Sequence, residues 1–310
     1  MSQLSAALAA PRFMPRPLAL LLLMGVATMF AGNHVAARVT FDDGTGLLLA
    51  IVVRSGVAVA VLGCLVIAQR KRLALPAASR PWQLLAGLLI AIQSLCLYSA
   101  VARIPVVVAL LLMNTFPIQL ALLSWALGGQ RPSGRAALIM AIILVGLVVV
   151  LEVPVWLASP EAMGPDWLSG VGLGLAAAAA YSGALWITEH RLSGVGNTFR
   201  SLLTMATVLL AMVLAGGAGL VPGGMAMPES ALGWWSLATL ALLYGVAFSV
   251  LFICLPRLDM ARNAPAMNTE PVAALVLGYL VLGQVLTSTQ LVGGAMVLSG
   301  IVLLGLSRRG

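Results

Sequence analysis

A few ionisable side chains interrupt stretches of this sequence that are otherwise apolar enough to lie in a lipid bilayer. They are His34, Arg54 and Glu270, the last beside Pro271. A charged group at bilayer depth is costly, so each is a candidate functional group. Glu270 predicts either a contact for a substrate amine or a protonatable gate, and the alternative is a structural carboxylate bonded to a neighbouring helix. His34 titrates near neutral pH and is a second candidate for proton coupling, whereas Arg54 is expected to anchor its helix by reaching outward.

Neutral amides and aromatic rings form a second set of candidates within the same stretches. The amides could hydrogen-bond a zwitterion, or could join neighbouring helices, which is the more common use of asparagine there. The rings could line a cavity, or could pack against other helices and form an interfacial belt. Together with Glu270 they make up the predicted substrate-binding set. The amides are Asn33, Gln93, Asn114 and Asn268, and the rings are Phe30, Phe116, Tyr181, Tyr244 and Phe248.

The composition places these residues in a membrane protein. The sequence is 61% hydrophobic and 8% charged, with a mean hydropathy of +1.08. An all-α membrane fold is expected, because backbone groups in lipid must be paired internally and no alternating strand pattern appears. Ten segments of about 20 residues are expected to cross the bilayer. They are Pro17–Ala37, Gly46–Ala68, Trp82–Ala102, Val106–Leu127, Arg135–Leu151, Leu168–Thr188, Thr198–Leu220, Trp234–Leu255, Asn263–Leu282 and Ser288–Leu306.

The net charge of +8 follows the ends of these segments and predicts an orientation. Nearly all arginines, and Lys71, fall on the side that holds both termini. The opposite side receives Arg38 and Arg103 together with most of the acidic residues. The positive-inside rule therefore predicts cytoplasmic N- and C-termini in a bacterial inner (plasma) membrane. The basic charge then signals topology, so the lipid bilayer is an expected partner and a nucleic acid is not.

The ten segments divide into two halves of five. Met113-Asn114-Thr115-Phe116-Pro117 returns as Met267-Asn268-Thr269-Glu270-Pro271, and Gly129-Gln130 returns at the same offset as Gly283-Gln284. An odd number of crossings per half predicts that the second copy is inverted, around a central cavity, as in many secondary transporters. The expected parts are a tail (1–16), a first repeat (17–151), an acidic linker (152–167), a second repeat (168–307) and a short tail (308–310). Phe116 is then the counterpart of Glu270.

Other chemistries have less support from the residues. An intramembrane enzyme would need a nucleophile–base pair or a metal cluster, and the two histidines and three cysteines form neither pattern, so no catalytic residue, metal or cofactor is expected. A phosphorylated substrate would call for buried cations, and the single lysine, Lys71, lies in a predicted loop. A receptor or structural membrane protein is disfavoured only by the repeat. The oligomeric state is left open.

The order of these motifs resembles the EamA-type repeat of the drug/metabolite transporter superfamily. Phe30-Ala31-Gly32-Asn33 is similar to that family's Trp-x-x-Asn start, Arg54 matches a family arginine, and Glu270-Pro271-Val272 matches its Glu-Pro-Val. The nearest resemblance is to amino-acid exporters of the YddG type, although Phe30 replaces Trp. The resemblance implies a cavity lined by helices one, three, four, six, eight and nine, which Phe30, Gln93, Phe116 and Tyr181 would face. It also implies export of small metabolites, with aromatic and other neutral amino acids expected first and other metabolites or drugs as the alternative.

Overall fold

The computed structural model describes residues 14–69, 74–129, 131–159, 164–221, 223–254, 257–258 and 264–307, and within them it is built of helices without strands. The helices are α2 (Arg16–Asp42), α3 (Leu47–Gln69), α4 (Arg80–Val101), α5 (Val106–Met113), α6 (Phe116–Ala126), α7 (Gly134–Val150), α8 (Val153–Ala158), α9 (Trp167–Arg191), α10 (Asn197–Gly217), α11 (Ala231–Cys254), α13 (Glu270–Leu282) and α14 (Ser288–Ser307). Two 3₁₀ turns, η1 (Ala77–Ser79) and η4 (Ala264–Thr269), precede α4 and α13.

Seven helical segments are long and apolar enough to cross a membrane, counting α5 and α6 as one segment and η1 with α4. Three shorter apolar helices, Gly134–Val150, Glu270–Leu282 and Ser288–Leu303, occupy the places of the fifth, ninth and tenth expected crossings. Large apolar side chains are exposed along many of these helices, which suits a protein surrounded by lipid. The all-helical prediction is confirmed for the described residues, while the count of ten crossings stays a prediction.

Several boundaries differ from those expected. Helix α2 runs on to Asp42 rather than ending at Ala37, because the polar residues that follow pair with each other and with the neighbouring helix end. The expected fourth crossing is two helices, α5 and α6, that break at Asn114 and Thr115. The expected ninth crossing starts as the 3₁₀ turn η4 before α13. The linker between the halves carries the short helix α8.

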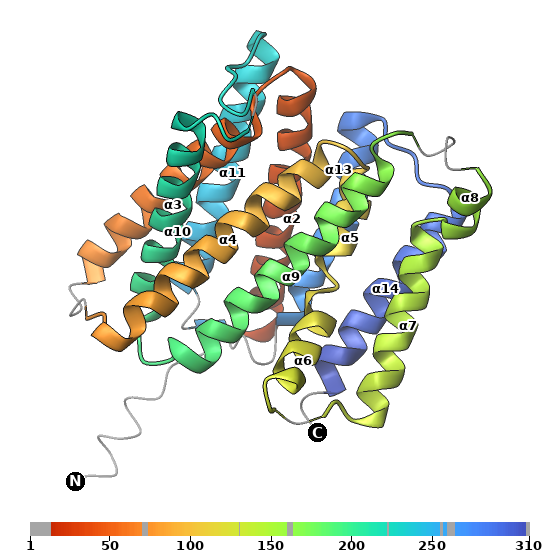
Figure 1. Cartoon of the computed structure of the whole chain (residues 1–310), viewed down its shortest axis with the longest axis horizontal. Coiled ribbons are helices and arrows are strands. Elements are labelled where there is room, and N and C mark those ends of the chain that lie inside the picture. The colour runs from red at the N-terminus through yellow and green to blue at the C-terminus, as the bar shows by residue number, and fades with distance from the viewer. Residues whose placement is uncertain are drawn as a thin grey trace.

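The helices pair in a pattern that is unchanged when the first half is exchanged for the second. Helix α2 packs on α11, and α9, its counterpart in the second half, packs on α4, the counterpart of α11. The pair α3–α10 and the pair α7–α14 each map onto themselves. Figure 1 shows α3 beside α10 at one edge of the molecule and α7 beside α14 at the other.

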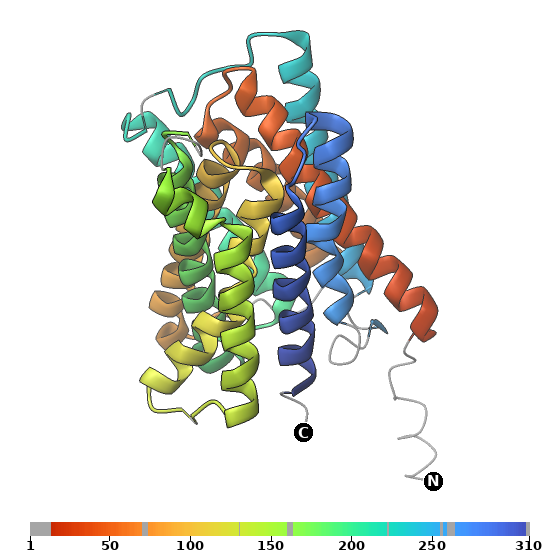
Figure 2. The same ribbon diagram turned by 90° about the vertical axis from the view of Figure 1, so that its right-hand side faces the viewer.

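The start of the first helix, α2, and the end of the last helix, α14, lie on the same side of the molecule. Helix α2 begins and α14 ends at the lower end of Figures 1 and 2, while the connections from α2 to α3 and from α13 to α14 lie at the upper end. Helices α2 and α13 pack against each other, and each contributes a residue to the site described next.

Candidate functional site

A contact between a histidine of α2 and a carboxyl group of α13 lies at the centre of the candidate site. His34 Nε2 is 3.6 Å from Glu270 Oε1, and their side chains are 8% and 22% exposed. Glu270 is the first residue of α13, with Pro271 in the first turn after the 3₁₀ turn η4. An acidic side chain is favoured at a helix N-terminus by the helix dipole. No acid lies near His34 in the sequence, so only the packing of α13 on α2 supplies this partner.

Arg54, on α3, is buried beside this pair. Its side chain is 6% exposed, so the expectation that it anchors α3 by reaching outward is wrong. The Arg54 Cζ atom lies 4.6 Å from the centre of the Tyr98 ring and 4.3 Å from that of Tyr244, and Nη2 donates to Ser94 Oγ at 2.9 Å. Such cation–π contacts stabilise a buried guanidinium. Arg54 also interacts electrostatically with His34, so one positive and one negative group flank the imidazole.

Asn33 joins three helices of the site through its amide. Its Nδ2 donates to the Leu240 carbonyl at 2.8 Å, and its Oδ1 accepts from the Tyr98 hydroxyl at 3.0 Å. Asn33 is fully buried. The Tyr98 ring in turn contacts His34 edge-on, with 5.8 Å between the ring centres. Tyr98 is thus a central contact of the site, although no motif in the sequence drew attention to it.

Two groups of aromatic rings flank these polar residues. Phe30 meets Tyr244 and Phe248 with 5.8 Å between ring centres in each case, and Tyr244 meets Phe248 at 4.6 Å. Phe116 and Tyr181 form the other group, with an edge-on contact at 4.9 Å. Tyr181 also interacts electrostatically with Glu270. All five predicted rings therefore fall into two clusters, one around Arg54 and one beside Glu270.

The remaining predicted amides lie at the helix break or beyond the described side chains. Asn114 Nδ2 donates to the Leu110 carbonyl of its own helix at 2.8 Å, where α5 ends. Gln93 is half-buried on α4, with its Nε2 3.9 Å from Met113 Sδ and its Oε1 3.4 Å from Ser94 Oγ. Ser94 therefore links Gln93 to Arg54. The side chain of Asn268 lies outside the described part of the structure.

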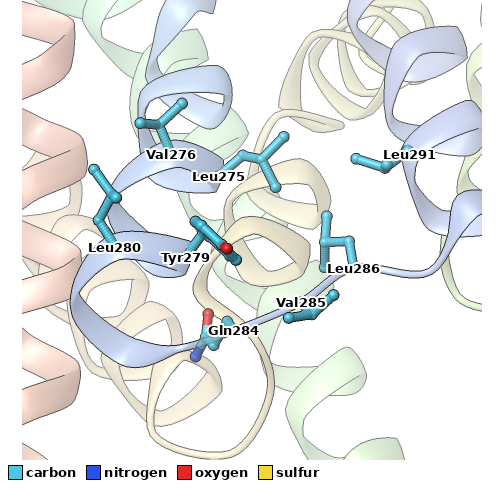
Figure 3. A pocket seen from close by; sticks show the side chains of 8 residues that line it. All are labelled: Leu275, Val276, Tyr279, Leu280, Gln284, Val285, Leu286 and Leu291. Atoms are coloured by element: carbon cyan, nitrogen blue, oxygen red, sulfur yellow. The ribbon is translucent and has the colours of Figure 1, made fainter.

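A separate cavity of about 320 Å³ lies where α13 is followed by the loop into α14 (Figure 3). Leucine and valine side chains line it, with Tyr279 and Gln284 as the polar members. Tyr279 is 60% exposed and Val285 is 76% exposed, so this cavity opens on the outer surface of the bundle. It is distinct from the residues around His34, and the central cavity expected from the sequence stays a prediction.

The site combines one carboxylate, one imidazole and one guanidinium in a largely apolar setting. Such a set can hold a small molecule that carries both charges, or can move a proton between Glu270 and His34. Within the described residues, no three His, Cys, Asp or Glu side chains come together as a metal site would require. The sequence pointed to His34 and Glu270 individually, whereas the roles of Arg54 and Tyr98 depend on tertiary contacts.

The chain is similar in sequence to known proteins. The profile of the EamA-like transporter family matches residues 17–152 and again residues 168–306. The chain is 26% identical over 230 residues to the protein "Uncharacterized transporter sll1319" of Synechocystis sp., a match that covers 70% of this chain and 64% of that protein. The chain therefore spans less than two thirds of this relative.

A protein of known crystal structure has a similar fold. The superposition gives a TM-score of 0.62 at 18% sequence identity and covers 95% of this chain and 99% of the other. These matches do not support the narrower resemblance to YddG-type exporters. The two profile matches together span most of the sequence and coincide with its two groups of apolar helices. The chain therefore belongs to the EamA-like transporter family and is a multi-pass membrane protein.

Proposed function

We propose that this protein is a secondary transporter that exports small metabolites, in the first place aromatic and other neutral amino acids, by alternating access. The observation that carries the proposal is the His34–Glu270 pair, which lies beside Phe116 and Tyr181 where two helices are interrupted. Interrupted helices at mid-depth are typical of substrate sites in secondary transporters. Glu270 would contact the substrate amine, and the aromatic rings would contact its side chain.

The proposal includes an arrangement in the membrane. Two inverted five-helix repeats would surround the site, in the inner membrane and with cytoplasmic termini. Two observations support the repeats: the two profile matches, and a pattern of helix pairs that is unchanged when the two halves are exchanged. The arginines at the lower helix ends, among them Arg16, Arg80 and Arg191, support the orientation. Export rather than uptake rests on family resemblance, and other small metabolites or drugs are the alternative substrates.

Efflux from proteoliposomes tests the proposal. Vesicles would be loaded separately with radiolabelled phenylalanine, methionine, threonine and a sugar phosphate, with and without a pH gradient. We expect amino-acid efflux above that of protein-free vesicles, and a rate that changes with the gradient if Glu270 carries a coupled proton. If no amino acid leaves the vesicles faster than from protein-free vesicles, and another compound does, the proposed substrate class is refuted.

A substitution at Glu270 tests the site itself. Glu270→Gln keeps the size of the side chain but removes its charge, and we expect efflux to fall by about tenfold or more, because an ion pair with the substrate amine is lost. Glu189→Gln is the matched control, because Glu189 is exposed at the far end of α9 and makes no contact with the site. Wild-type efflux across the pH range in Glu270→Gln would contradict the assignment.

A further inference from the structure

The unusual feature of Arg54 is that it is a buried cation without a carboxylate partner. Among the described residues, the contacts within 4 Å between a basic and an acidic side chain are His34–Glu270 and Arg38–Asp42, and neither includes Arg54. A cation buried in a protein is normally paired with an anion or fully hydrogen-bonded, because its desolvation is otherwise uncompensated. Tyr98 and Tyr244 contact the guanidinium through their ring faces, and Tyr98 also interacts with it through its hydroxyl group, but neither residue supplies a carboxylate.

Two buried nitrogens near the Tyr98 ring lack a hydrogen-bond partner within the described residues. These nitrogens are Arg54 Nε and His34 Nδ1. Arg54 and His34 contact the same Tyr98 ring and interact electrostatically with each other. Buried polar atoms in folded proteins nearly always have a partner, so a ligand atom or a water is needed to complete this pair. Arg54 Nε–H is always a donor, and His34 Nδ1 donates beside an ionised Glu270 when both ring nitrogens carry a proton, so an acceptor would satisfy both residues.

We propose that Arg54 and His34 form a carboxylate-binding subsite, and that the transported molecule is held there by its carboxylate while its ammonium group lies at Glu270. The proposal rests on the proposed transport function and specifies the substrate as a zwitterion. A carboxylate accepts from the Nε edge of a guanidinium in the strong, charge-assisted geometry. The Ser94 hydroxyl accepts from Nη2, the terminal nitrogen on the same edge as Nε, and this contact holds the guanidinium in place.

The nearby charges favour a carboxylate over a phosphate. Glu270 lies 3.6 Å from His34, so its negative charge is close to any anion bound at the subsite. A phosphate dianion would meet a single arginine and this opposing carboxylate. A zwitterion instead places its ammonium toward Glu270 and its carboxylate toward Arg54, which compensates both buried charges.

Direct titration of analogues against the purified protein separates the two ends of the ligand. Phenylalanine, methionine and threonine would each be compared with the amine that lacks the carboxylate and with the acid that lacks the amine, and phenyl phosphate would represent phosphates. We expect the acids to bind wild-type protein and to bind Arg54→Gln about tenfold to 100-fold more weakly, which is the range for a lost charged hydrogen bond. Affinity for the amines is expected to change little in Arg54→Gln, and to fall in Glu270→Gln.

The possible outcomes distinguish this subsite from the transport proposal. Acids that bind while the amines and amino acids do not would leave a carboxylate site at Arg54 but overturn the zwitterion and refute amino acids as substrates. Amines and amino acids that bind equally well to wild type and Arg54→Gln would refute the subsite and leave amino-acid transport standing. Phenyl phosphate that binds more tightly than every acid would also overturn it. If Arg54→Gln does not fold, Arg54→Lys and the wild-type titrations still decide, because failure of all acids to bind wild-type protein refutes the subsite.

Discussion

The site residues differ in how completely their polar atoms are paired. Both polar atoms of the Asn33 amide are used in contacts between helices, to Leu240 and to Tyr98. The neighbouring His34 has one nitrogen directed at Glu270 and one without a partner in the described structure. Because unpaired buried groups are costly, Asn33 acts as a structural contact and His34 remains available to a ligand or a proton. Adjacent residues of one helix thus take different parts.

Removing the Tyr98 hydroxyl tests the structural part of this division. Tyr98→Phe leaves the buried Asn33 Oδ1 without its donor but retains the ring that contacts Arg54. We expect the free energy of unfolding to fall by about 1–3 kcal/mol, measured by denaturant titration in detergent micelles. Tyr279→Phe is the control, because Tyr279 is 60% exposed, and little change is expected there. Equal effects of the two substitutions would show that the Asn33 contact contributes nothing.

Sequence reasoning reached part of the site at this scale. It selected His34 and Glu270 because ionisable residues stand out in apolar segments. It could not predict that they meet, because they are more than 200 residues apart and the contact depends on the packing of α13 against α2. It assigned Arg54 to an outer anchor for the same reason, since exposure toward lipid, water or core depends on the rotation of α3.

Polar contacts connect the end of α2 to the start of α11. Asp43, which follows α2, accepts hydrogen bonds from the backbone N–H groups of Glu229 and Ser230 at 3.0 and 3.1 Å, and also from the Ser230 hydroxyl. The Ser230 hydroxyl oxygen also accepts from Gly233 N at 3.2 Å, in the first turn of α11. Asp43 therefore satisfies donors at a helix N-terminus, where unpaired N–H groups collect.

The hydrogen bonds of Asp43 with Glu229 and Ser230 predict that the stability of the protein depends on pH. The hydrogen bonds from Ser230 lower the pKa of Asp43 below its ordinary value of 3.8. A lowered pKa in the folded state stabilises the protein above the ordinary pKa, and this contribution is lost as the pH falls through the folded-state pKa. We expect Asp43→Asn to lower the melting temperature near pH 6, and the difference from wild type to shrink as the pH falls below 3.8 and through the folded-state pKa.

Asp42→Asn provides the matched control for this experiment. Asp42 is adjacent and pairs with Arg38 one turn earlier, with a side chain that is 55% exposed. Such exposed pairs contribute little to stability, so a small change at every pH is expected. If Asp42→Asn lowers the melting temperature as much as Asp43→Asn does, the effect comes from surface charge and not from the hydrogen bonds of Asp43.

Segment positions were predictable from hydropathy, whereas their interruptions were not. The apolar runs and their basic flanks located the helices to within a few residues, as for Ser288–Ser307 and Gly134–Val150. Pro271 has no backbone N–H to donate, and the 3₁₀ turn η4 lies just before it. The break at Asn114 and Thr115 was missed, because the same apolar run continues across it and Pro117 is tolerated in the first turn of α6.

Glycines determine how closely the paired helices α7 and α14 approach each other. A Cβ atom on Gly293 of α14 would lie 2.5 Å from the Val150 backbone nitrogen and 2.7 Å from the Gly146 carbonyl oxygen of α7. A Cβ on Gly300 would likewise lie 2.4 Å from the Ile143 side chain. Small residues at such contacts are typical of packed membrane helices. Helices α7 and α14 thus form a close pair at one edge of the bundle (Figure 1).

Substitution of Gly293 tests this packing. Gly293→Ala places a methyl group against backbone atoms of α7 that cannot move aside, and we expect a loss of about 1–3 kcal/mol in unfolding free energy, measured by thermal unfolding in micelles. Gly172→Ala is the matched control, because Gly172 is also within a helix but has open space around it. That change is expected to be neutral or stabilising by up to about 1 kcal/mol. Two equal losses would mean that α7 and α14 do not depend on close contact.

Phe116 and Glu270 occupy the same position in the two halves of the sequence, and this difference has an energetic consequence if the halves are inverted repeats. With identical side chains in both halves, exchanging their conformations would convert the inward-facing state into the outward-facing state at no cost, so the two states would be equally populated. A carboxylate in one half and a phenyl ring at the matching position of the other, both on the first residue of a half-helix, remove that degeneracy. The unloaded protein would then rest facing one side of the membrane, and bound substrate or a proton on Glu270 would shift the balance toward the other.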